Sequence, residues 1–192
     1  MLLNPNDMIE KGIITFPEWV PESDYQKYIQ PNAIDITLDY VYRFNSMSTF
    51  TLSETKKEMR ELFFVSSIIR DGEYYFPITG NMDALSDFKI DLPDGISAEL
   101  IIRSTLNRNE IFITSGLCDS GFSGNIGCVI RNQGPTAYIA PKTRIGQIKF
   151  MKSDSCKLYD GSYNNLEGHY TSEQQKEPIE VKSTKPKKGA QK

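Results

Sequence analysis

Four polar side chains at the end of an apolar run are the first candidates for a chemical role. Arg103, Ser104, Thr105 and Arg108 stand in what the sequence predicts as a tight turn. Hydroxyls, backbone amides and guanidinium groups in such a turn can face one anion, and arginine binds phosphate oxygens through paired hydrogen bonds at any working pH. The turn is therefore a candidate phosphate cradle. An Arg-Ser pair at a strand end also fits a capped turn with a surface charge.

A second candidate is Asp119, which stands among the glycines Gly116, Gly121 and Gly124 just after an apolar strand. Glycines let the backbone approach a ligand closely and adopt turns that other residues disfavour. An aspartate held in such a turn could orient a water molecule or a hydroxyl group. The alternative is an Asx turn that joins two strands of a hairpin.

Short strands must position both groups. Apolar and polar residues alternate over Ile34–Leu38, the pattern of a half-buried strand, and runs rich in β-formers separated by Gly, Pro and Asp turns follow. Two short helices are expected, one over Met8–Lys11 with Asn4 or Asn6 as its cap, and one over the charged stretch Thr51–Leu62. The other predicted strands are Leu62–Ser67, Glu73–Ile78, Ser97–Arg103, Ile111–Thr114, Ile126–Arg131, Ala137–Ile139 and Ile145–Met151. This organisation predicts a mainly β fold, a distorted barrel or jelly roll with a few short helices.

Composition narrows the class of protein. The 192 residues are 39% hydrophobic and 24% charged with a net charge of −3, a balance typical of a globular domain. One histidine cannot supply a catalytic zinc site, and three irregularly spaced cysteines indicate reduced thiols in a cytoplasmic protein. We expect neither a signal peptide nor a membrane span.

The charge is unevenly distributed along the chain. Five lysines and no acidic residue follow Val181, so the rest of the chain is acidic, and we expect no nucleic-acid partner. Residues 1–178 are predicted to form one domain, and residues 179–192 a lysine-rich, disordered tail.

Four motifs in order resemble those of the dCTP deaminase/dUTPase superfamily. Arg103–Leu106 is similar to its Arg-Ser-Ser-Leu phosphate motif, and Arg108 falls where deaminases carry a further arginine. Gly116–Gly124 resembles the Gly-Leu-Ile-Asp-x-x-Tyr-x-Gly motif, and Asn132 ends the next strand as expected. Arg144–Phe150 is similar to the closing Arg-Ile-Ala-Gln-Leu strand.

The first half of the chain favours the dCTP deaminase-like branch of that superfamily. Gln30–Leu38 resembles the deaminase strand Gln-Pro-Ala-Ser-Ile-Asp-Leu-Arg-Leu. Near the other end, Tyr163, Tyr170 and Gln174 resemble the tyrosine and glutamine positions of the deaminase C-terminal flap.

The sequence departs from the dCTP deaminase pattern at one position that matters for the reaction. The resemblance implies that a deaminase carries its proton-transferring glutamate five residues beyond Gly124, where this chain has Val129, and valine cannot move a proton. Asp119 matches the aspartate that orders the attacking water in dUTPases. The resemblance thus implies a dUTP diphosphatase, which forms dUMP and pyrophosphate. A dCTP deaminase and a non-catalytic nucleotide-binding paralogue are the alternatives.

The resemblance also implies how such a site is assembled. A homotrimer is expected, with Arg103, Ser104, Thr105 and Arg108 of one subunit binding the triphosphate and Asp119 of another positioning the water. The implied base and sugar contacts are Gly116, Phe122, Val129 and Asn132. Magnesium is expected to be carried by the triphosphate of the deoxynucleotide substrate, with no dedicated protein ligands.

Overall fold

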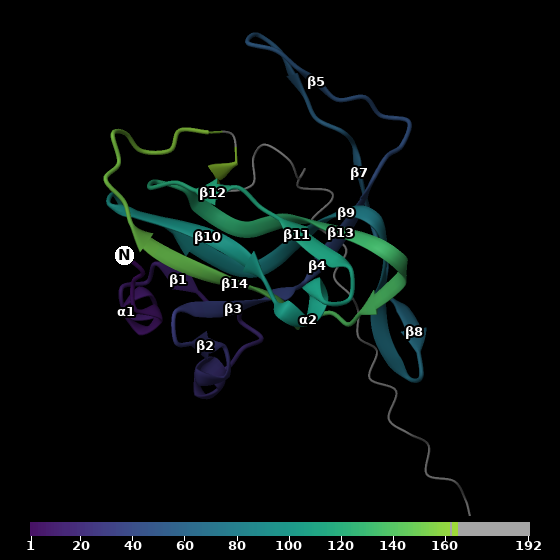
Figure 1. Ribbon diagram of the computed structural model, residues 1–192, viewed down its shortest axis with the longest axis horizontal. Helices are drawn as coiled ribbons and strands as arrows, with labels where there is room; N and C mark the ends of the chain where they lie inside the picture. Colours follow the sequence, from purple (N-terminus) through teal and green to yellow (C-terminus); the bar gives the residue numbers. More distant parts are fainter. Residues whose placement is uncertain (162, 165–192) are drawn as a thin grey trace, which may run out of the picture.

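A computed structural model describes residues 1–161 and 163–164, and its ribbon consists mainly of two β-sheets (Figure 1). One sheet has the order β12 (Leu117–Cys118), β10 (Ile96–Ile102), β14 (Thr143–Lys152), β3 (Ala33–Leu38) and β2 (Ile29–Gln30). The other has the order β11 (Ile111–Thr114), β13 (Ser123–Ile139), β9 (Glu73–Asp91), β4 (Tyr40–Phe44) and β7 (Leu62–Phe64). The short strands β1 (Ile14–Thr15) and β8 (Ile68–Arg70) also pair with β9.

The mainly β prediction is confirmed, in a sandwich-like form. Within the described residues the two sheets do not close into one barrel. Apolar side chains from both sheets form a common core, which includes Ile36 of β3, Phe88 of β9, Ile130 of β13 and Phe150 of β14. The strands therefore present alternate residues to the space between the sheets, as a two-layer β architecture requires.

The helices of the described residues are short. Helix α1 (Pro5–Glu10) begins at the cap Asn4, whose Oδ1 accepts a hydrogen bond from the backbone N–H of Asn6 at 3.0 Å. The predicted first helix is confirmed with different bounds, because it begins three residues before Met8 and Lys11 is its C-cap. Gly12 follows with φ of +66°, a conformation that commonly ends a helix. The others are the 3₁₀ helix η1 (Glu22–Lys27) and the four-residue α2 (Ser104–Asn107).

The predicted helix over Thr51–Leu62 is wrong. The segment forms the hairpin strands β5 (Thr51–Leu52) and β6 (Lys57–Glu58), and then enters β7, where Leu62 packs with Tyr42 and Leu85. The stretch offers only three apolar residues, too few for the stripe that anchors a surface helix to a core. Figure 1 shows this hairpin as an arm that projects from the sheets.

Strand β3 departs from its predicted half-burial, because all six of its residues are buried. The buried carboxylate of Asp35 explains the difference. It accepts hydrogen bonds from Gln30 Nε2 at 3.0 Å and Gln147 Nε2 at 2.9 Å, and it forms an ion pair with Arg144 Nη1 at 3.2 Å. A polar residue can thus face inward, because its charge and lone pairs are satisfied by two neighbouring strands.

The Asp35 cluster continues toward the predicted phosphate-binding turn. Arg103 Nη1 donates to the carbonyl oxygen of Arg144 at 3.0 Å, and the Arg103 N–H donates to Ile145 O at 3.1 Å. The residue that caps α2 is therefore held by the same stretch of β14 that pairs with Asp35.

Substitution of Asp35 by alanine should lower the free energy of unfolding by about 3 kcal/mol, because it removes the ionic partner of Arg144 and the shared acceptor of two side-chain amides. Urea denaturation followed by circular dichroism measures the change. Asp24→Ala is the matched control, because Asp24 forms an exposed ion pair with Lys27 at 2.8 Å and should cost less than about 1 kcal/mol. Equal losses in the two variants would contradict the structural role of the Asp35 cluster.

Candidate functional site

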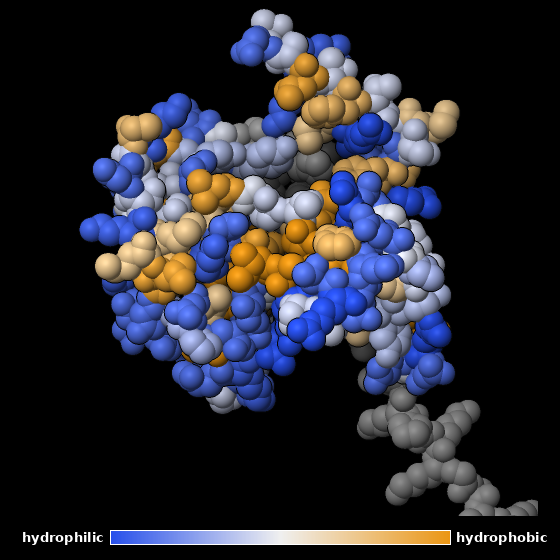
Figure 2. Space-filling model, viewed as in Figure 1, coloured by the Kyte–Doolittle hydropathy of each residue, from blue (hydrophilic) through white to orange (hydrophobic). Residues whose placement is uncertain are grey.

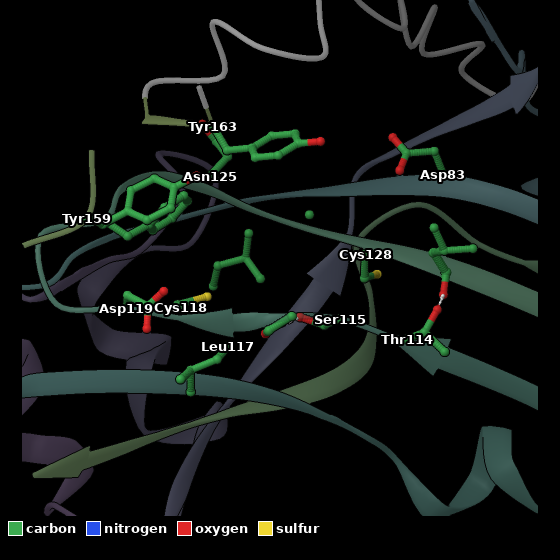
Figure 3. Close-up of a pocket in the computed structure, with 15 residues that line it drawn as sticks. Asp83, Thr114, Ser115, Leu117, Cys118, Asp119, Asn125, Cys128, Tyr159 and Tyr163 are labelled. Atoms are coloured by element: carbon green, nitrogen blue, oxygen red, sulfur yellow. Dashed lines mark hydrogen bonds between the residues drawn. The ribbon is translucent and has the colours of Figure 1, made fainter. Parts of the chain in front are cut away.

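A cavity of about 370 Å³ collects most of the predicted base-side residues. Its walls are the end of β11 with the turn that follows, the first half of β13, one residue of β9 and the segment after β14 (Figure 3). The lining residues are Asp83, Thr114, Ser115, Gly116, Leu117, Cys118, Asp119, Phe122, Asn125, Ile126, Gly127, Cys128, Val129, Tyr159 and Tyr163. A volume of this size is typical of a small-molecule site.

Asp119 lies at one end of the cavity, exposed, in the turn between β12 and β13. Its carbonyl oxygen accepts the N–H of Phe122 at 3.1 Å, which closes the turn. Gly121 has φ of +90°, and a Cβ at this position would lie 2.9 Å from the backbone nitrogen of Tyr159. The glycine predicted to allow a close approach is therefore required by the chain's own later segment.

Ser120 connects this turn to the neighbouring segments. It is buried, and its Oγ donates to Ile96 O at 2.9 Å and accepts from Ser155 Oγ at 2.6 Å. Its carbonyl oxygen accepts the N–H of Tyr159 at 2.7 Å. These bonds hold the backbone of Asp119 between β10 and the segment that follows β14.

Two tyrosines from that segment line the cavity. The ring of Tyr159 packs edge-on against Phe122 with the centroids 5.8 Å apart, and Tyr163 lies against Lys57, whose Nζ is 4.4 Å from the ring centroid. The predicted flap residue Tyr163 is thus placed at the cavity, whereas Tyr170 and Gln174 lie outside the described residues. Tyr159 was not predicted, and no motif in the sequence marks it.

Val129 is half-buried and lies between two polar residues in a cross-strand row. It pairs with Thr114 of β11 and with Asp83 of β9. Directly opposed residues of antiparallel strands point to the same face, so the three side chains share one side of the sheet. The neighbouring residues Cys128 and Ile130 are buried on the core side, as the two-residue period predicts, although Cys128 also reaches the cavity wall.

Asp83 was not predicted, because nothing in the sequence near Val129 points to it. No acidic residue occurs between Asp119 and Asp154, but the register of β9 brings a carboxylate from 46 positions earlier in the chain to the side of Val129. Asp83 is only 7% exposed.

The predicted phosphate residues lie apart from this cavity. Arg103 is half-buried at the start of α2, Ser104 and Thr105 are exposed in its first turn, and Arg108 is exposed at its end. None of the four lines the cavity that holds Asp119. Within the single chain, therefore, the candidate phosphate cradle and the candidate water-positioning carboxylate lie apart.

The predicted contact Asn132 has a structural environment. It is 6% exposed, its Nδ2 donates to Ile78 O at 2.8 Å and to Pro135 O at 2.7 Å, and its Oδ1 accepts from the N–H of Gly134 at 3.0 Å. These bonds span the irregularity between Asn132 and Ala137 in the pairing of β13 with β9. Asn132 does not line the cavity, and its hydrogen bonds stabilise a bend in β13.

No group of three or more histidine, cysteine, aspartate or glutamate side chains is placed to hold a metal ion within residues 1–161 and 163–164. The two carboxylates of the cavity come from separate parts of the fold, Asp83 from β9 and Asp119 from the turn between β12 and β13. No helix in the described part of the chain is long and apolar enough to cross a membrane.

The fold and the site define a two-sheet β protein with a cavity between the strand β13 and a glycine-rich turn. Residues 7–153 match the sequence model of the dCTP deaminase-like family. The chain belongs to this family.

Curated relatives carry two kinds of name. The probable deoxyuridine 5'-triphosphate nucleotidohydrolase of Methanothermobacter thermautotrophicus is 28% identical over 144 residues, which are 73% of this chain and 90% of the relative. The dUMP-forming dCTP deaminase of Dictyoglomus thermophilum is 30% identical over 183 residues, 88% of this chain and 92% of the relative.

A solved structure shares the fold. The crystal structure of the 2'-deoxycytidine 5'-triphosphate deaminase from Agrobacterium tumefaciens superposes with a TM-score of 0.58 at 14% identity. The match covers 79% of this chain and 48% of that chain, so this chain spans about half of the solved one.

The two thiols of the cavity wall should resist alkylation. Burial, with a smaller contribution from the charge of Asp119, raises the pKa of Cys118 to about 11, and burial raises the pKa of Cys128 to about 12. At pH 8 only about one Cys118 thiol in a thousand is then the reactive thiolate. Iodoacetamide followed by mass spectrometry should label the exposed Cys156 first, and all three thiols in denaturant. Native labelling of Cys118 at the rate of Cys156 would contradict the closed wall.

Proposed function

We propose that this protein is a dUTP diphosphatase that converts dUTP and water to dUMP and pyrophosphate. The observation that carries the proposal is that one cavity holds a carboxylate at one end, Asp119, and an apolar residue, Val129, in its wall. A carboxylate near the substrate can orient a water molecule, whereas the strand residue that would move a proton in deamination has no titratable group. The relatives named as dUTP nucleotidohydrolases support this reading.

In this proposal the pyrimidine and sugar occupy the cavity between Gly116, Phe122 and Val129. The Asp119 carboxylate accepts a hydrogen bond from the water that attacks the α-phosphorus, and the bond to the pyrophosphate oxygen breaks as the new P–O bond forms. Because Asp119 is exposed at the cavity edge, it can reach a phosphate that stays outside while the base is enclosed. Magnesium bound to the triphosphate would offset its negative charge.

The active form is proposed to be a homotrimer in the cytoplasm, in which Arg103, Ser104, Thr105 and Arg108 of a neighbouring subunit bind the triphosphate. The separation of these residues from Asp119 within one subunit supports a site shared between subunits. Apolar side chains in the middle of one face of the molecule also support association (Figure 2). Among the exposed apolar residues are Ile101 of β10 and Leu117 of β12.

A second candidate is dCTP deamination, because Asp83 places a carboxylate beside Val129 and several relatives are named as dUMP-forming dCTP deaminases. A non-catalytic nucleotide sensor is the third. A panel of deoxynucleotides with separate detection of pyrophosphate and ammonia distinguishes them. Pyrophosphate from dUTP without ammonia from dCTP supports the diphosphatase, ammonia from dCTP at a comparable rate replaces it with the deaminase, and neither product indicates a sensor.

Asp119→Asn should lower kcat for dUTP by on the order of a hundredfold or more, because the amide keeps the shape but orients the water poorly. Steady-state pyrophosphate release measures the change. Asp94→Asn is the matched control, since Asp94 is an exposed aspartate in another turn and does not line the cavity. Near-normal turnover of Asp119→Asn would remove Asp119 from the proposed mechanism.

Arg108→Ala should cost about 2–4 kcal/mol of transition-state binding, as expected for the loss of one partner of a desolvated charge pair. The measurement is kcat/KM for dUTP, which should fall by about 30- to 1000-fold. Arg70→Ala is the matched control. Arg70 lies at the end of β8, where its guanidinium stacks on the ring of Tyr138 of β13, and its removal should leave kcat/KM unchanged. If both variants behave like the parent protein, the triphosphate is bound elsewhere.

A further inference from the structure

The cavity holds two carboxylates at different places, and the function proposed above uses only Asp119. Asp83 lies on β9, across the cavity from Asp119, and Figure 3 shows its carboxylate pointing into the space between them. The hydroxyl of Tyr163 points toward it from the opposite wall. The buried carboxylate of Asp83 therefore faces the part of the cavity that lies away from Asp119.

The chemistry of Asp83 limits what can lie against it. An ionised carboxylate only accepts hydrogen bonds, and leaving its charge against an apolar or electron-rich ligand edge costs free energy. The two oxygens of a carboxylate offer about four acceptor positions, so Asp83 can accept from a ligand N–H or O–H in addition to its interactions within the protein. A ligand edge with such a donor therefore fits this wall best.

Thr114 supplies a complementary group on the other side of Val129. Adjacent strands are about 4.8 Å apart, so Thr114 and Asp83, two strands apart in one row, are separated by about 10 Å at the backbone. The Thr114 hydroxyl donates to Val129 O at 3.5 Å, which is long for a hydrogen bond between oxygens. The hydroxyl can therefore rotate and donate to a ligand instead. The row thus offers a hydroxyl donor, an apolar spacer and a carboxylate acceptor along one line.

We propose that Asp83 determines base specificity by accepting a hydrogen bond from the N3–H of uracil, while the Thr114 hydroxyl donates to the neighbouring C4 carbonyl oxygen. This inference rests on the proposed function, because it takes the cavity as the pyrimidine site. Cytosine presents an unprotonated N3, whose lone pair would face the carboxylate. The row of Thr114, Val129 and Asp83 therefore favours the N3–H and C4 carbonyl of uracil over the unprotonated N3 and C4 amino group of cytosine.

The test measures binding, so that it does not depend on turnover. Isothermal titration calorimetry compares the α,β-imido analogues of dUTP and dCTP with the parent protein and with Asp83→Asn. The asparagine amide can donate to the N3 of cytosine, so the preference for the uracil analogue should fall by about tenfold or more. Asp91→Asn, an exposed aspartate on the same strand and outside the cavity, should leave the preference unchanged. An unchanged preference in Asp83→Asn overturns the proposal.

A change in the ligand avoids any effect of the substitution on folding. Methylation of N3 in the imido-dUTP analogue removes the N–H donor and should weaken binding to the parent protein by about tenfold or more. Equal binding of the methylated and unmethylated analogues overturns the role of Asp83. N3-dependent binding without hydrolysis of dUTP would instead refute the diphosphatase and leave this inference standing. Ammonia release from dCTP that is lost in Asp83→Asn would replace base reading by proton transfer.

Discussion

The interaction of the buried Asp35 carboxylate with Arg144, whose side chain is partly exposed, is the constraint on which the arrangement of the site depends. Taking a carboxylate out of water is costly, and it is tolerated here because Gln30, Gln147 and Arg144 all donate to it. These donors come from β2 and β14, so satisfying one charge fixes β3 between its two neighbours. The carbonyl oxygen of Arg144 accepts a hydrogen bond from the guanidinium of Arg103. The position of the start of α2 therefore depends on the interaction between Asp35 and Arg144.

The cavity depends on a different kind of constraint, the packing of a late segment against a glycine-rich turn. Ser120 and Gly121 are the points of contact, one through its hydrogen bonds and the other because a side chain there would strike Tyr159. Asp119 is therefore positioned by backbone that cannot shift without moving Tyr159, which itself forms part of the cavity wall. A glycine-rich motif that reads as a flexible loop is in this protein a fixed junction.

The sequence predicted much of the sheet and part of the site, for identifiable reasons. The end of α1 and strands such as β10, β11 and β14 follow from local capping and turn residues, which act over a few positions. The charged segment Thr51–Leu62 was assigned to a helix because helix breakers are absent, and the deciding contacts of Leu62 are with distant strands. The motif Gly116–Gly124, which contains Asp119 and Phe122, and Val129 of the strand that follows it all line one cavity. Asp83 could not be found in this way, because cross-strand register is a property of pairing and has no local signature.

The distance along the chain between Asp35 and its partners has a kinetic consequence. Gln147 follows Asp35 by 112 residues, so β3 leaves a ribosome long before β14 exists. At about 5–20 residues per second the delay is on the order of 5–20 s. During this time Asp35 lacks its two partners from β14, and burying its carboxylate without them would cost free energy. The charge that stabilises the finished sheet thus also acts as a solubilising group on the nascent chain.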